Sequence, residues 1–146
     1  MTKTDVPRVL LAGVAGTATM TALMLAAPMM GMPPMNIGHM LGSMMGGVDA
    51  LGWAAHLMIG VALAFGYALV GARLPGHGPL RGALYGVAPW LVAQLMVMPM
   101  MGAGVFGGSM MGAAGSLMGH LVYGAVVGAI VRDEAPATAG LHAAAR

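Results

Sequence analysis

Four long apolar stretches, separated by short segments with few charges, organise this sequence. They run from Arg8 to Met30, from Leu51 to Ala72, from Leu80 to Met101 and from Ala113 to Arg132. A helix needs about 20 apolar residues to cross a bilayer, and each stretch reaches that length. Because backbone N–H and C=O groups cannot stay unpaired in hydrocarbon, each stretch is predicted to be a transmembrane helix. The third is predicted to kink at Pro89, since proline has no N–H to donate to the preceding turn.

The composition supports an all-α, multi-pass membrane protein. Hydrophobic residues make up 59% of the 146 positions and charged residues only 7%, and the mean hydropathy is +0.86. A soluble domain carries about 25% charged residues, so this chain has too few to cover a water-facing surface. We expect one transmembrane domain over residues 1–132, with the lipid bilayer as its first partner, and a flexible cytoplasmic tail over residues 133–146.

The charged residues and the absence of cysteine exclude several kinds of site and partner. Without cysteine there are no disulfides and no thiolate metal sites. Six Lys and Arg residues without interleaved aromatic residues do not make a nucleic-acid surface, so no nucleic-acid partner is expected. Paired carboxylates and a nucleophile with a base are also missing from the predicted helices. We therefore expect a protein that is not an enzyme.

The basic residues predict the orientation in the membrane. All of them flank the same ends of the predicted helices: Lys3, Arg8, Arg73, Arg81, Arg132 and Arg146. By the positive-inside rule, both termini lie in the cytoplasm, and the methionine-rich loops face the periplasm or the cell exterior from an inner membrane. Lys3 and Arg8 before an apolar run are also typical of a signal peptide. A matching segment in the middle of the chain argues that the first helix is retained.

The two halves of the chain align with each other as repeat 1 (8–72) and repeat 2 (80–132). The ordered matches are Arg8–Ala15 with Arg81–Ala88, Pro28–Gly31 with Pro99–Gly102, Ser43–Gly46 with Ser109–Gly112, and His56–Gly60 with His120–Gly124. Each repeat contains two predicted helices, so the sequence predicts parallel helical hairpins related by a pseudo-two-fold axis along the membrane normal. Small-xxx-small steps predict close helix packing in a four-helix bundle, at Gly82–Gly86, Gly115–Gly119 and Gly124–Gly128.

Three blocks of the sequence, two of them from the repeat matches, also carry a family resemblance. With Gly13–Thr21, Pro99–Gly102 and His120–Gly124, the chain resembles small four-span bacterial inner-membrane proteins known only as a domain of unknown function. The similarity covers nearly all of the chain except the two tails. It implies the same fold and membrane location, and it brings no activity, ligand or catalytic residue.

Methionine is concentrated in two windows of the chain. Apart from Met1, every methionine lies between Met20 and Met58 or between Met96 and Met118. Thioether sulfur is a soft, neutral ligand that suits Cu(I) or Ag(I), and several sulfurs must converge to bind one ion. The candidate ligands at the outer face are Met29, Met30, Met32, Met35, His39, Met40, Met44, Met45, Met98, Met100, Met101, Met110 and Met111.

The alternative is that methionine only packs irregular helix ends, because its flexible side chain fills gaps. Residues 37, 40, 41, 44 and 45 are apolar and follow the spacing of one helical face. This pattern predicts a short helix in the outer interface, with Asn36 as its N-cap after two prolines. Asp49 is predicted to cap the second long helix in the same way.

His56 and His120 occupy equivalent positions in the two repeats. Ionisable groups within spans usually face a partner or a cavity, and the predicted axis places both residues at the same depth. Two such imidazoles can ligate a metal ion, act as axial ligands of a haem or relay protons. Alternatively, each bonds a backbone carbonyl or a lipid headgroup.

Three functions therefore remain open from the sequence. The first is binding or passage of Cu(I) or Ag(I) at the outer face by the methionine clusters and the histidine pair. The second is a structural or accessory subunit that packs as a homo-oligomer or against another membrane protein. The third is a haem protein for electron transfer with His56 and His120 as ligands.

Overall fold

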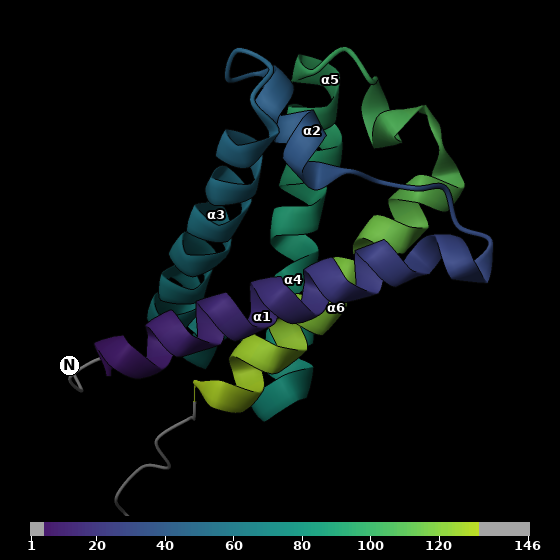
Figure 1. Cartoon of the computed structure of the whole chain (residues 1–146). Coiled ribbons are helices and arrows are strands. Elements are labelled where there is room, and N and C mark those ends of the chain that lie inside the picture. The colour runs from purple at the N-terminus through teal and green to yellow at the C-terminus, as the bar shows by residue number, and fades with distance from the viewer. Residues whose placement is uncertain (1–4, 132–146) are drawn as a thin grey trace, which may run out of the picture.

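The computed structural model describes residues 5–131 and contains helices but no strand in that range (Figure 1). The helices that are long and apolar enough to span a membrane are Val6–Met30, Asp49–Arg73, Gly78–Met100 and Met110–Ile130. The predicted fold class and the four predicted spans are thus confirmed, with ends that differ by a few residues. Arg132 and the predicted tail at 133–146 lie outside the described residues.

These spans contain several distinct helical elements. In chain order, the elements are α1 (Val6–Ala26), η1 (Ala27–Met30), α2 (Ile37–Ser43), α3 (Asp49–Val70), η2 (Gly71–Arg73), α4 (Gly78–Val92), η3 (Ala93–Val97), α5 (Met98–Met100), η4 (Val105–Gly108) and α6 (Met110–Ile130). Three of the four η elements are short 3-10 turns, whereas η3 is a π-helical turn.

Helix α2 begins as the sequence predicts. The Asn36 side chain accepts a hydrogen bond from the backbone N–H of His39 at 2.9 Å, so this residue is the N-cap. The predicted cap at Asp49 is wrong, because Val48 occupies the N-cap position of α3. The Asp49 carboxylate instead lies 3.1 Å from Nδ1 of His39 and links the start of α3 to α2.

The third span is irregular, although not at the proline itself. α4 contains Pro89 and continues as an α-helix to Val92, and the π-helical turn η3 follows. Such wider turns rotate the side chains that follow them and are frequent at functional sites. Here Gln94 and Met98 are both buried, with 2% and 8% of their surface exposed.

The long helices do not contact one another equally. α1 packs against α3 and α6, and α6 packs against α4, whereas α3 and α4 make few contacts. Helix α2 folds back onto α3, away from the end of the molecule where α1 begins (Figure 1).

This arrangement does not confirm the predicted pseudo-two-fold axis. The hairpins α1–α3 and α4–α6 both pack, but a two-fold axis would make the α3–α4 contact equal to the α1–α6 contact. The aligned serines also differ in role. Ser43 is the last residue of α2, whereas Ser109 is the N-cap of α6 and accepts from Gly112 N–H at 3.1 Å.

Glycines allow α4 and α6 to approach closely, as the Gly82–Gly86 and Gly124–Gly128 steps predict, whereas the Gly115–Gly119 step meets methionine side chains instead. A Cβ on Gly82 would overlap the carbonyl of Gly124, and one on Gly128 would overlap the carbonyl of Gly78. A Cβ on Gly86 would overlap the carbonyl of His120. Membrane helices associate through such close backbone contact, because burial in lipid supplies no hydrophobic driving force.

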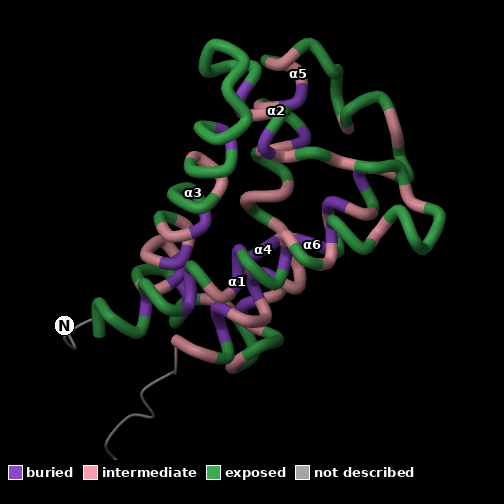
Figure 2. The backbone as a smooth tube through the Cα atoms, viewed as in Figure 1, coloured by how far each residue is buried: buried purple, intermediate pink, exposed green. Residues whose placement is uncertain are grey.

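Buried residues gather where α1, α4 and α6 meet, while much of α3 is exposed (Figure 2). Tyr123 of α6 is 2% exposed, and its hydroxyl donates to the Gly60 carbonyl of α3 at 2.5 Å. On the outside, large apolar side chains such as Leu25 and Leu69 are 62% and 71% exposed. An apolar outer surface is what a helix bundle presents to lipid.

Candidate functional site

His56 and His120 line the same cavity between the long helices. This space, which we call the His–Met cavity, has a volume of about 250 Å³. Its lining comes from α1, α2, α3, α6 and the irregular third span. From the predicted two-fold axis, the sequence placed the two histidines at one depth; the structure shows that both line one cavity.

His120 is held by its own helix. Its Nδ1 lies 2.8 Å from the Ser116 carbonyl oxygen, which can only accept, so Nδ1 carries the proton and donates. The neutral ring then has its lone pair on Nε2. A structural histidine also makes this bond, as the alternative interpretation expects. Metal-ligating histidines use the same arrangement, with one ring nitrogen held and the other free.

His56 is held by a neighbouring helix instead. Its Nε2 lies 3.2 Å from the Thr21 hydroxyl of α1. The Trp53 ring packs edge-on against the imidazole, with ring centroids 6.3 Å apart. With Nε2–H donating to the hydroxyl, Nδ1 becomes the nitrogen with the lone pair.

Methionines line the same cavity as the two imidazoles. Met20, Met40, Met98 and Met101 also line the His–Met cavity. Met40, Met98 and Met101 were candidate ligands from the sequence, whereas Met20 was not. The sequence feature that could have identified Met20 is its spacing within a helix, because Met20 and Met24 are one turn apart on α1 and both are buried.

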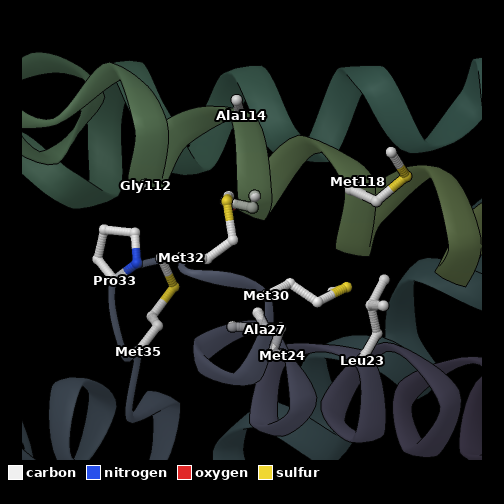
Figure 3. A pocket seen from close by; sticks show the side chains of 12 residues that line it. Leu23, Met24, Ala27, Met30, Met32, Pro33, Met35, Gly112, Ala114 and Met118 are labelled. Atoms are coloured by element: carbon white, nitrogen blue, oxygen red, sulfur yellow. The ribbon is translucent and has the colours of Figure 1, made fainter.

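A second group of methionines lines a separate cavity of about 320 Å³, which we call the methionine pocket (Figure 3). Met30, Met32 and Met35 were predicted ligands and lie here together. Met24 and Met118 complete the set and were missed by sequence reasoning. In Figure 3, Met30 and Met32 come from the segment below the pocket and Met118 from α6 above it.

The other predicted ligands do not converge on these cavities. Their side chains are between 46% and 90% exposed: Met29, Met44, Met45, Met100, Met110 and Met111. His39 is also exposed, and its imidazole lies against the Asp49 carboxylate. It does line a third cavity, of about 380 Å³, together with Met35 and Met40.

The described residues offer few ligands for hard metal ions such as Mg²⁺ or Ca²⁺. No group of three or more His, Cys, Asp or Glu side chains that could hold a metal ion occurs within residues 5–131. The nitrogen and sulfur donors around the His–Met cavity form a soft set, which favours Cu(I) or Ag(I) over Mg²⁺ or Ca²⁺.

The comparison with known proteins agrees with the resemblance found in the sequence. A family of unknown function, DUF6789, matches residues 4–139, which is nearly the whole chain. The protein belongs to this family. No curated protein and no solved structure matches it. The chemistry of this DUF6789 protein must therefore be argued from its own side chains.

Proposed function

We propose that this DUF6789 protein binds Cu(I) or Ag(I) in the His–Met cavity. One observation carries the proposal: two imidazoles and four thioether side chains line a single cavity among the long helices. Each imidazole has one nitrogen in a hydrogen bond, to the Ser116 carbonyl or to the Thr21 hydroxyl. The other nitrogen of each ring is left to ligate, and imidazole and thioether are the neutral ligands that suit a soft monovalent ion.

The size of the cavity favours an ion over a haem. Sites for drug-sized ligands have volumes of about 300–1,000 Å³, and a porphyrin is larger than many such ligands. The His–Met cavity, at about 250 Å³, is below that range. An ion held directly by side chains needs little space of its own.

The proposed location is an inner membrane, with both termini in the cytoplasm. Arg8, Arg73 and Arg81 lie at the start of α1, the end of η2 and the start of α4, which are ends on one side of the molecule. Helix α2, which helps to line the His–Met cavity, lies on the opposite side (Figure 1). The positive-inside rule then puts the cavity near the periplasmic or extracellular face.

The test is metal binding by the full chain, purified in mild detergent and loaded with Ag(I), or with Cu(I) under a reductant. The double variant His56→Ala/His120→Ala is expected to weaken affinity by about 100-fold or more, because loss of even an outer-shell partner costs about 10–100-fold. His39→Ala is the matched control, because its exposed imidazole lies outside the cavity.

The possible results separate the three functions. Unchanged affinity in the double variant would refute the histidine ligands. Failure of the unaltered protein to bind either metal would refute soft-metal binding and favour the accessory subunit. A Soret band in the purified protein would favour the haem function instead.

A further inference from the structure

The methionine pocket contains five thioether side chains from four segments of the chain. Met24 comes from α1, Met30 from η1, Met32 and Met35 from the link to α2, and Met118 from α6. The rest of the lining is almost entirely apolar. Ser116 contributes a hydroxyl, but that oxygen already accepts from Nε2 of Gln94 at 3.3 Å. Sulfur is therefore the principal ligand atom that this pocket offers.

The shape of α6 suits this arrangement of sulfurs. Gly115 has no side chain, and a Cβ there would lie 2.6 Å from Cε of Met32. The missing side chain lets Met32 extend across to α6. Met30 and Met118 are 66% and 54% exposed, so their flexible side chains have room to move toward an ion.

The methionine pocket adjoins the His–Met cavity along two helices. On α1, Met24 lines the pocket and Met20, one turn earlier, lines the cavity. Both pack on Gly119 of α6, where a Cβ would lie 3.3 Å from Cγ of Met20 and 3.7 Å from Cγ of Met24. On α6, Ser116 lines the pocket, and its carbonyl accepts from the cavity residue His120.

We propose that the methionine pocket is a second soft-metal site, with thioether sulfur as its only ligand and Cu(I) or Ag(I) as its ion. The buried Met24 and Met20, one turn apart on α1, would link this site to the His–Met cavity. Movement of the ion between them would exchange one neutral thioether for another, with no change in oxidation state. The link to the cavity rests on the proposed function, whereas the sulfur site does not.

The experiment compares two triple variants of the full chain by Ag(I) titration and elemental analysis. Met30→Leu/Met32→Leu/Met118→Leu removes three sulfurs from the pocket but keeps its apolar volume, and such exchanges are well tolerated in packed sites. The matched control makes the same exchange at positions that are 56–90% exposed: Met29→Leu/Met110→Leu/Met111→Leu.

The pocket variant is expected to bind about one Ag(I) instead of about two, because leucine offers no soft ligand. The control is expected to keep both. X-ray absorption gives a second measurement. Silver retained by His56→Ala/His120→Ala protein should have sulfur ligands only, whereas silver retained by the pocket variant should have nitrogen and sulfur ligands.

The results also separate failure of this proposal from failure of the proposed function. Equal binding by the pocket variant and the control would overturn the methionine site and leave an apolar pocket, such as one for a lipid chain. If the double histidine variant binds normally while the pocket variant loses an ion, the His–Met cavity is refuted and the pocket stands. Gly115→Ala, which displaces Met32 without removing a sulfur, should also weaken binding at the pocket.

Discussion

Replacing Gly86 with alanine tests how the α4–α6 contact supports the candidate site. The new Cβ would overlap the His120 carbonyl oxygen and would lie 2.9 Å from the carbonyl carbon, whereas ordinary contact begins at 3.4 Å. The helices must therefore separate by about 0.5 Å or more, and a gap of that size forfeits about a quarter of the contact energy at each affected atom pair. Overpacking of this kind costs about 1–3 kcal/mol.

A matched control comes from the same pair of helices. At Gly112 of α6, a Cβ would lie 3.4 Å from Oγ of Ser109, which is ordinary contact. Gly112→Ala should therefore be neutral or should gain the advantage of alanine within a helix, about 0.5–1 kcal/mol.

The assay is unfolding in mixed SDS and mild-detergent micelles, followed by tryptophan fluorescence. Trp90 of α4 is a suitable reporter because its indole N–H donates to the Ala113 carbonyl of α6 at 3.1 Å. Gly86→Ala should also weaken Ag(I) binding, since the displaced backbone carries His120. A Gly86→Ala protein that is as stable as Gly112→Ala and binds Ag(I) normally would refute both the close contact and its connection to the site.

Other predictions address the orientation, the α2 helix and the position of His56. A topology reporter inserted in residues 31–36 should read as external, and a cytoplasmic signal there would overturn the orientation. Asn36→Ala removes the cap of α2 and should lower stability by about 1 kcal/mol, with faster hydrogen exchange in that helix; unchanged exchange would contradict the role of the cap. Thr21→Val removes the hydroxyl that holds Nε2 of His56 and should weaken Ag(I) binding by about 10–100-fold. Thr19→Val is its control because that hydroxyl bonds only its own helix, at the Ala15 carbonyl, and equal affinities would show that the Thr21 bond does not position the ring.

The four spans could be predicted from the sequence because hydropathy and length depend only on local composition. The N-cap at Asn36 was predictable for a similar reason, since its bond to His39 N–H spans three residues. Asp49 shows where local reasoning fails. Its carboxylate has two possible partners, the free N–H groups of its own helix and an imidazole on α2, and only the folded chain brings the imidazole within reach.

The candidate site was predictable only in part. The repeat match aligned His56 with His120, and both residues line one cavity. The methionines had no such constraint. Met29 and Met30 are neighbours in sequence, yet the first is 90% exposed and the second lines the methionine pocket. Which methionine lines the pocket depends on how the chain runs from η1 to α2 and on the space at Gly115. Both are features of the tertiary structure, which local sequence does not determine.

The unequal packing of the two halves bears on how the His–Met cavity would work. A symmetric duplication would give both histidines the same surroundings, but here His120 is positioned by its own helix and His56 by a hydroxyl on α1. The position of the second ring therefore depends on how α1 and α3 pack, and a Cβ on Gly60 of α3 would overlap the hydroxyl of Thr17. α3 makes few contacts with α4 and is held instead by its packing against α1 and α2. If the cavity binds an ion, one imidazole is therefore fixed within α6, whereas the position of the other depends on the contact between α1 and α3.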